Sequence, residues 1–277
     1  MRMRFAVVFQ LLVLSLIIAA AGASTVRMTE PYNATIMGNS TVYLGKVGPG
    51  QTFYVTISAN TTNSTGAVFQ RGWNELLATD LPRGWIAENS SLYNAYLSVK
   101  VTPPADAENG TYYFNLTAVN AGNYSKLGAA HFIAEINVTP NVFKLQVSPS
   151  TISTGPGEPT TIYITINNTG VSDNPFLISA QGLPAWNLTK EVIALHHTSE
   201  VFQYPLYQDE PGVYQAVINV TSTASPLVTK RSTVNLTVQA SVLNDYAAVG
   251  EGAVGFPIIY EPIYAIMQLI SRLFHSS

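Results

Sequence analysis

The stretch Gly48-Pro49-Gly50, followed by Thr52-Phe53-Tyr54-Val55-Thr56-Ile57-Ser58, decides the fold because the chain repeats it later. The second copy reads Gly155-Pro156-Gly157 and then Thr161-Ile162-Tyr163-Ile164-Thr165-Ile166-Asn167. In both copies, apolar side chains alternate with polar or tyrosine side chains, which is the pattern of a half-buried β-strand. The chain therefore reads as two related β-domains in tandem.

Two further motifs recur in the same order after each of these strands. Leu81-Pro82-Arg83-Gly84-Trp85 corresponds to Leu183-Pro184-Ala185-Trp186, and Asn109-Gly110-Thr111-Tyr112 corresponds to Pro211-Gly212-Val213-Tyr214. The tryptophan precedes the tyrosine by 27 positions in the first copy and by 28 in the second. Conserved spacing as well as conserved motifs indicates a duplicated domain.

The composition excludes several classes of protein. Hydrophobic residues make up 47% of the 277 residues and charged residues only 10%, which favours packed strands over a disordered chain. The formal charge of -3 gives no basic footprint for nucleic acid. The chain has no cysteine, which excludes disulfides, thiolate metal sites and a cysteine nucleophile.

The ends of the chain differ from its middle. Residues 1–23 have a basic start, an apolar run and a small-residue box at Ala21-Gly22-Ala23, and they predict a secretory signal peptide; an uncleaved membrane anchor is the alternative. The remaining boundaries predict one β-sandwich over residues 24–139, a second over 140–240, and a linker with a C-terminal helix over 241–277.

Short alternating blocks separated by Gly, Pro, Asn and Asp predict an all-β fold of two immunoglobulin-like antiparallel sandwiches. The expected strands of the first domain are 43–44, 53–58, 67–69, 96–101, 112–119 and 132–138. Those of the second are 143–147, 162–167, 176–180, 192–195, 201–206, 213–221 and 233–239.

Tyr112 and Tyr214 each follow an acidic residue and a glycine just before the longest expected strand, which is the arrangement of a tyrosine corner. Trp85 and Trp186 are expected to seal one end of each core. Together with the Gly-Pro-Gly strand, these motifs resemble those of NEW3 (alpha-galactosidase-associated) and related archaeal and bacterial cell-surface immunoglobulin-like domains. The resemblance covers roughly residues 40–240 and implies an extracytoplasmic β-sandwich module. The second copy departs at Ala185, where the first has Arg83-Gly84, and this affects the local turn rather than the fold.

Asn-x-Ser/Thr acceptor sequences are unusually dense, at about three times the roughly four matches expected by chance. The 13 candidate N-glycosylation sites are Asn33, Asn39, Asn60, Asn63, Asn89, Asn109, Asn115, Asn123, Asn137, Asn167, Asn187, Asn219 and Asn235. Asparagines that simply favour turns and exposed strand faces are the alternative explanation. Alternation places four candidates within expected strands, Asn115, Asn137, Asn219 and Asn235, opposite the apolar series and thus outward.

The C-terminal stretch predicts a short amphipathic helix over residues 263–274, with Pro262 in its first turn. Its apolar side carries Ile263, Ile266, Met267, Leu269, Ile270, Leu273 and Phe274. The stretch is strained as a membrane span because Glu261 and two prolines interrupt it. Lying in a membrane interface, docking on an envelope protein, a short span, and folding back on its own sandwich all remain open.

Catalytic and cofactor motifs are not found. Four scattered histidines do not form a zinc motif, His196-His197 is expected to be a pair without nearby acidic ligands, and no cofactor is expected. Trp73, in the unrepeated Arg71-Gly72-Trp73-Asn74 insert, is the one tryptophan not assigned to a core. It could stack on a sugar ring, and packing at the edge of a core is the alternative.

The sequence as a whole predicts a non-enzymatic, extracytoplasmic cell-surface glycoprotein with a structural or adhesive role, in an envelope or surface layer of archaeal type. Attachment would be through the C-terminal helix to membrane or to an envelope protein, and open sheet edges would allow a homo-oligomer or lattice. The competing hypothesis is a carbohydrate-binding or accessory module that works beside a separate glycoside hydrolase.

Overall fold

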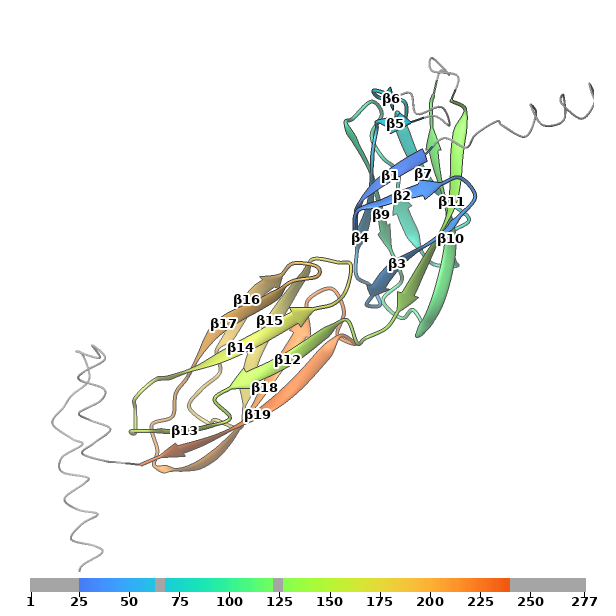
Figure 1. Cartoon of the computed structure of the whole chain (residues 1–277). Helices are drawn as coiled ribbons and strands as arrows, with labels where there is room; N and C mark the ends of the chain where they lie inside the picture. Colours follow the sequence, from blue (N-terminus) through green and yellow to red (C-terminus); the bar gives the residue numbers. More distant parts are fainter. Residues whose placement is uncertain (1–24, 63–67, 122–126, 240–277) are drawn as a thin grey trace, which may run out of the picture. The chain divides into compact units, whose positions relative to one another are not determined.

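The computed structural model describes residues 25–62, 68–121 and 127–239, and every regular element among them is a β-strand (Figure 1). The chain forms two compact units. The first runs to Val142 and includes Gly170–Ser172, whereas the second comprises Phe143–Thr169 and the chain from Asp173 onward. The predicted signal peptide and C-terminal helix lie outside the described residues.

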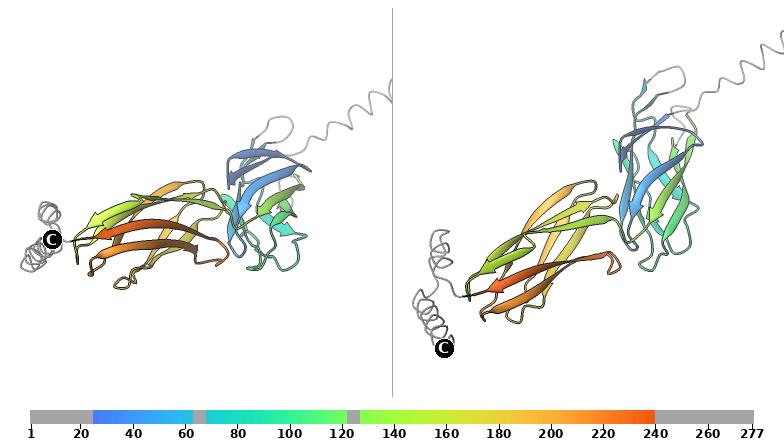
Figure 2. Two further views of the ribbon diagram at one scale, coloured as in Figure 1. Left: turned by 90° about the horizontal axis from the view of Figure 1, so that it is seen from below. Right: turned by 60° about the horizontal axis from the view of Figure 1, so that its bottom comes forward.

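The first unit is a sandwich of two sheets (Figure 2). One sheet has the order β2-β1-β4-β9-β8 and the other β3-β11-β10-β7, with a small β5-β6 ribbon beside them. The strands are β1 (Thr25–Glu30), β2 (Ala34–Met37), β3 (Thr41–Val47), β4 (Phe53–Ser58), β5 (Thr61–Thr62), β6 (Val68–Phe69), β7 (Glu75–Thr79), β8 (Ile86–Glu88), β9 (Tyr96–Thr102), β10 (Gly110–Val119) and β11 (Ala129–Val138).

The second unit is also a sandwich, with sheets ordered β12-β14-β17 and β13-β19-β18-β15-β16. Its strands are β12 (Phe143–Ser148), β13 (Thr151–Thr154), β14 (Thr160–Asn168), β15 (Asn174–Gln181), β16 (Thr189–Ala194), β17 (Ser199–Leu206), β18 (Gly212–Ser222) and β19 (Thr229–Val238). In both units the pairing is antiparallel except at one edge, where β3 pairs with β11 and β13 with β19 in parallel.

Period-two alternation builds both cores. Along β9, for example, Leu97, Val99 and Val101 are fully buried while the residues between them are half-buried. In the first core, Phe53 and Phe114 pack with ring centroids 6.4 Å apart, and in the second the Phe143 and Phe176 rings are 4.6 Å apart. The apolar series identified in the sequence is thus the inward-facing series of the sandwiches.

The repeated Gly-Pro-Gly stretch forms the same turn in both units. The backbone N–H of Gln51 donates to the Gly48 carbonyl at 3.1 Å, and that of Glu158 donates to the Gly155 carbonyl at 3.2 Å. The third residue of each turn is a glycine with positive φ, 71° at Gly50 and 76° in the second copy, which a type II turn requires. The Gln51 side chain also accepts from the Gly48 N–H at 2.8 Å, as the second copy's glutamate does at 3.0 Å.

The tyrosine corner is present in each unit. The Tyr112 hydroxyl donates to the Glu108 carbonyl at 3.0 Å, and the Tyr214 hydroxyl donates to the Glu210 carbonyl at the same distance. Both rings are half-buried at the start of the longest strand of their unit. With the sheet orders above, this feature confirms two immunoglobulin-like sandwiches.

Candidate functional surface

The described residues bring together no group of three or more His, Cys, Asp or Glu side chains that could hold a metal ion. The nearest approach is at His196, whose Nδ1 lies 2.6 Å from Asp173 Oδ1. The expectation that this histidine pair lacks an acidic neighbour is therefore wrong, because the chain entering β15 places Asp173 beside it. Partial burial, and secondarily the His196 ring, lower the pKa of His197.

Trp73 does not offer a ring face to a sugar, and this corrects the stacking hypothesis. Its side chain is fully buried in the first core, and its Nε1–H donates to the Thr25 carbonyl at 3.4 Å. The adjoining Asn74 is tied down as well, because its Nδ2 donates to the Ala121 carbonyl at 2.8 Å and its Oδ1 accepts from the Ala121 N–H at 2.7 Å. The insert is therefore a buried part of the sandwich.

Three of the four strand sequons lie on outer sheet faces. Asn115 on β10 and Asn137 on β11 are half-buried, between the buried side chains of their strands, and Asn235 on β19 is exposed. The residues two positions later, Thr117 and Thr237 among them, share the same outer face. At Asn115 and Asn235 the acceptor amide and its hydroxyl residue thus stand side by side on an outer face.

Asn219 on β18 departs from that arrangement, which corrects the expectation that it is exposed. Its side chain is only 8% exposed, and its Oδ1 is a buried atom without a hydrogen-bond partner. Strands flank it on both sides, with Ser179 opposite on β15 and Arg231 opposite on β19. A central strand position can therefore point outward and still be covered by its neighbours.

The sequons outside strand interiors are accessible. Six of them have exposed asparagines in loops and turns: Asn33, Asn39, Asn60, Asn89, Asn109 and Asn187. Asn167, near the end of β14, is half-buried. Asn63 and Asn123 lie outside the described residues.

The environment of Asn115 is compatible with a glycan on its amide nitrogen. Nδ2 of Asn115 donates to Asp80 Oδ2 at 2.6 Å. A glycosylated asparagine keeps one N–H on that nitrogen, so the bond to the carboxylate can persist while the sugar replaces the second hydrogen. The contact would then orient a glycan rather than compete with it.

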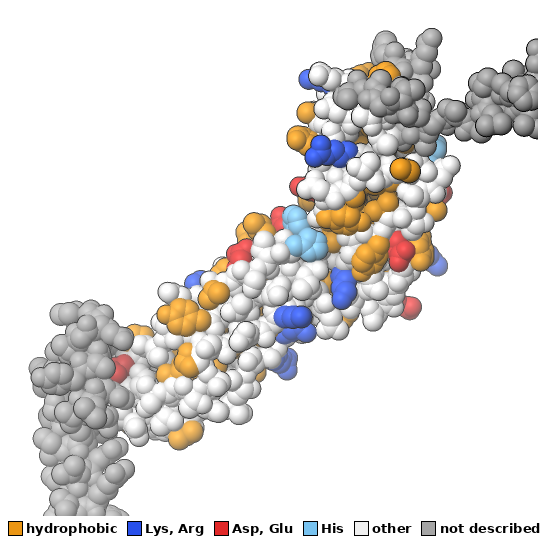
Figure 3. Space-filling model, in the orientation of Figure 1, with side chains coloured by type: hydrophobic (Ala, Val, Ile, Leu, Met, Phe, Trp, Pro, Cys, Tyr) orange, Lys and Arg blue, Asp and Glu red, His pale blue; other side chains and the backbone are white. Residues whose placement is uncertain are grey.

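Charged side chains are sparse on the surface. In Figure 3, hydrophobic and uncharged polar side chains cover most of the visible face of each unit, and Lys, Arg, Asp and Glu side chains occur between them. Two ion pairs lie among the described residues, Lys100–Glu88 at 2.8 Å and His196–Asp173 at 2.6 Å. The surface offers contacts through hydroxyl, amide and aromatic groups rather than through a charged field.

No helix among the described residues is long and apolar enough to cross a membrane. The apolar residues Ile263, Ile266, Met267, Leu269, Ile270, Leu273 and Phe274 of the predicted helix lie beyond those residues. Their attachment role stays a prediction.

No family model and no curated protein matches the sequence. Solved structures similar to this chain include a chimeric titin Z1Z2, with 14% identity over 80% of this chain and 100% of that chain and a TM-score of 0.37. The titin Ig tandem domains A164-A165 have 8% identity over 79% and 97%, with a TM-score of 0.25. The adhesin InvE of Yersinia pseudotuberculosis has 10% identity over 80% and 62%, with a TM-score of 0.27. The fold assignment given above stands on the chain's own strand order and tyrosine corners.

Proposed function

We propose that this protein is a non-enzymatic, extracytoplasmic cell-surface glycoprotein with a structural or adhesive role. The observation that carries the proposal is the placement of the sequons. Of the 11 sequon asparagines in the described residues, seven are exposed and three are half-buried, and only Asn219 is covered. N-glycans occur on proteins that enter a secretory route, which agrees with the predicted signal peptide.

The fold supports a mechanical rather than a catalytic role. Each unit is a sandwich with its own core, and the described residues of neither unit gather a metal-binding cluster. Such modules act as spacers that hold other surfaces apart, and they bind through sheet faces, edges and loops. Attachment to the membrane or to an envelope protein through residues 263–274 belongs to the same proposal, as does an archaeal envelope of NEW3-like type.

The carbohydrate-binding alternative loses its leading residue, because the Trp73 ring is buried. The described residues hold no other tryptophan with an exposed side chain, since Trp85 is buried and Trp186 is half-buried. The sugar-binding alternative therefore loses the residue on which it rested.

Fractionation of the native protein from its host envelope tests the proposal. Detergent and high-salt extractions are compared side by side, and the size of the released species is measured by sedimentation. We expect release only in detergent, or release by salt in large assemblies, which would make the C-terminal segment a membrane anchor or a subunit contact respectively. Recovery of a free monomer without detergent or salt would contradict attachment to the surface.

A further inference from the structure

The outer faces of the two sheets of the first sandwich differ in whether their strands carry sequons. On β10 and β11 the outward asparagines begin Asn-apolar-Thr sequences, Asn115-Leu116-Thr117 and Asn137-Val138-Thr139, although Thr139 follows β11 and is buried. On β4 and β9, stretches of the same length also end in a threonine or serine, but they begin with tyrosine or lysine in place of asparagine. They are Tyr54-Val55-Thr56, Tyr96-Leu97-Ser98 and Lys100-Val101-Thr102. One sheet is thus marked for glycans, and the strand interiors of the other have none.

We propose that the outer face of β4 and β9, with the flanking β1 and β8, is kept free of glycan to bind the same face of a second copy of this chain. This contact face consists of the outward side chains listed here: Arg27, Glu30, Tyr54, Thr56, Ile86, Glu88, Tyr96, Ser98, Lys100 and Thr102. The inference deepens the proposed function, on which it rests, by naming the surface and the partner of the adhesive contact.

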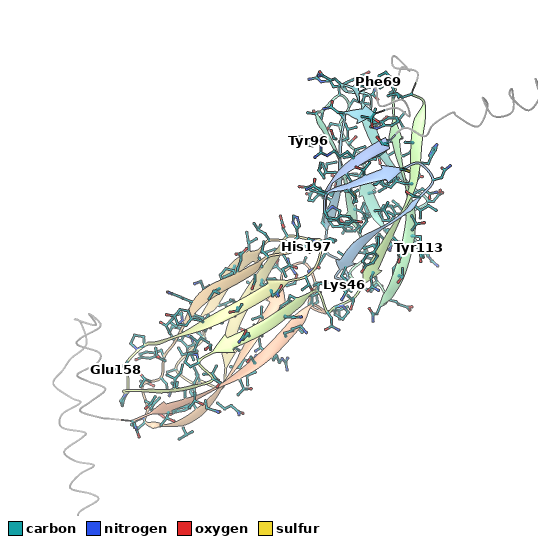
Figure 4. All side chains as sticks on the ribbon, in the orientation of Figure 1. Lys46, Phe69, Tyr96, Tyr113, Glu158 and His197 are labelled. Carbon is teal, nitrogen blue, oxygen red and sulfur yellow. The ribbon has the colours of Figure 1, made fainter. Side chains whose placement is uncertain are left out.

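Sequons near the contact face lie at its borders. Asn33 is in the turn between β1 and β2, Asn60 follows β4, and Asn89 follows β8. Glycans on these residues would surround the face without covering its centre. Figure 4 shows that Tyr96, on the contact face, and Tyr113, on the face with the strand sequons, project from opposite sides of the first unit.

The contact face carries exposed apolar side chains that are suited to burial against protein. Tyr54 is 49% exposed, Tyr96 is 63% exposed and Ile86 is 66% exposed. Tyrosine is enriched at protein interfaces because its ring contributes large apolar area with few rotamers to fix. These three side chains give the face apolar anchors on three different strands.

Several hydroxyl groups between the anchors already form hydrogen bonds within the outer face of the sheet. Thr56 Oγ1 lies 2.6 Å from Glu30 Oε2 and 2.9 Å from Ser98 Oγ. The hydroxyls of Thr52 and Thr102 are 2.8 Å apart. Burial of polar groups is costly when it leaves them without partners, so this network lowers the cost of removing water from the face.

The balanced charge of the contact face favours a second copy as the occupant. The contact face holds two cations, Arg27 and Lys100, and two anions, Glu30 and Glu88, and Lys100 lies 2.8 Å from Glu88. A balanced face of this kind repels neither itself nor its copy, and a two-fold contact can place each cation against a partner's carboxylate. A polyanion, a basic partner or an anionic membrane would select a face with one dominant sign.

The size of the face predicts a weak contact. Four strands about 4.8 Å apart, and about 3.3 Å for each of the seven residues of β9, give a face of roughly 450 Å² in outline. Stable interfaces bury roughly 800 Å² on each partner, so a dissociation constant in the micromolar range is expected. Many such weak contacts between copies on one cell surface would together give a much stronger association through avidity.

Sedimentation equilibrium of the full native chain in mild detergent tests the proposal with two matched substitutions. Tyr96→Asp places a charge on the contact face, and Tyr113→Asp places one on the opposite sheet at a tyrosine of similar exposure. We expect wild type to dimerise, Tyr96→Asp to weaken the dimer at least tenfold, and Tyr113→Asp to leave it within threefold of wild type. Circular dichroism confirms that both variants fold, as surface substitutions should.

A second pair of variants uses the glycan itself. Lys100→Asn creates an acceptor sequence ending at Thr102 on the contact face, and Arg231→Asn creates one ending at Thr233 on the outer face of β19. When intact mass shows the added glycan on both, the first variant should be monomeric and the second should associate as wild type does.

A wild-type chain that remains monomeric at tens of micromolar would overturn the proposal, even if it binds a polysaccharide. An equal effect of Tyr96→Asp and Tyr113→Asp, or a dimer that survives a glycan at position 100, would do so as well. Glycopeptide mapping of wild type separates these failures from failure of the proposed function. A glycosylated monomer contradicts only the contact face, whereas an unglycosylated dimer contradicts only the glycoprotein.

Discussion

Trp85 in the first sandwich and Trp186 in the second occupy equivalent points of the repeat, but they are buried to different extents. The Trp85 side chain is 7% exposed, and its ring lies 5.4 Å from that of Tyr112 and 6.2 Å from that of Phe114. Trp186 is half-buried, and its ring contact is with Tyr207 at 6.0 Å. The same motif therefore serves two different cores.

The neighbouring strands explain the difference. Two residues after the corner tyrosine, the first unit has Phe114 and the second has Ala216, so the second core lacks the aromatic ring beneath its tryptophan. Another large side chain changes strand between the two units. Tyr204 on β17 is fully buried opposite Ile162, where the first unit has Val101 opposite Phe53. Duplicated domains can keep the density of a core while moving its large side chains from one strand to another.

The turn before each tryptophan also differs. In the first unit the Trp85 N–H donates to the Pro82 carbonyl at 3.1 Å, with Gly84 at a φ of 82°. In the second, the Trp186 N–H donates to the Leu183 carbonyl at 3.1 Å, so the proline moves to the second position of the turn. The glycine with positive φ then lies before the turn, at Gly182.

The largest expected effect is a loss of stability that is greater for substitution of Trp85 than for substitution of Trp186. Trp85→Ala should lower the free energy of unfolding of the first sandwich by about 3 to 5 kcal/mol, the usual cost of removing a buried aromatic ring. Trp186→Ala should cost the second sandwich less than half of that, because its ring already meets solvent. Hydrogen exchange of the full chain, followed by mass spectrometry, reports each sandwich separately. Equal losses would mean that the difference in burial has no energetic meaning.

Substitution of the glycine before each tryptophan, Gly84 or Gly182, is expected to cost different amounts of stability. A Cβ at Gly182 would collide with the Gln215 carbonyl oxygen, whereas one at Gly84 would meet Pro104 at an ordinary 3.5 Å. Gly182→Ala should therefore cost about 3 kcal/mol or more, through the clash in addition to its positive φ. Gly84→Ala should cost only about 1 to 2 kcal/mol, from its positive φ alone. Urea unfolding of the two variants checks the order, and a larger loss for Gly84→Ala would contradict it.

The tyrosine corners should respond alike, in contrast to the tryptophans. Tyr112→Phe and Tyr214→Phe each remove one hydroxyl that donates to a carbonyl at 3.0 Å. Each should cost about 1 kcal/mol, the net value of such a bond. The melting temperature of each sandwich gives the readout. Values that differ by much more than this would show that the corners are not equivalent.

The smallest effect is a pH dependence confined to the second sandwich. Because partial burial and His196 lower the pKa of His197 below 6.5, the unfolded chain binds more protons than the folded chain between the two values. Stability should therefore fall slightly as the pH drops below 6.5. His197→Gly should remove this slope, and the φ of 55° at this position suits glycine. The melting temperature between pH 7.5 and pH 5 measures the effect, and a slope that persists in the variant would contradict its assignment.

Strands with several alternating apolar residues could be predicted from the sequence, and short edge strands could not. β4 was expected over residues 53–58 and is found there as Phe53–Ser58. β13 has one isoleucine in four residues, and β7 has two adjacent leucines, so neither shows a period of two. Pairing with β19 and β10 forms these strands, and that information comes from residues distant in sequence.

The surface was only partly predictable for the same reason. Strand phase places Asn115 and Asn235 on outer faces, but it carries no information about neighbours, so it could not show that Asn219 is covered. The sequence left sugar stacking and core packing open for Trp73, because the unrepeated insert has no counterpart for comparison. Its burial depends on Thr25 and on the insert's own turn.

Glycopeptide mapping of the protein purified from its native host is the most direct test of whether this protein is a cell-surface glycoprotein. We expect Asn115, Asn137 and Asn235 to carry glycans, together with the exposed loop sequons. We expect Asn219 to carry none, because a glycan has no room at a covered strand position. Unmodified asparagines at the outward sequons would contradict the assignment of this protein as a cell-surface glycoprotein.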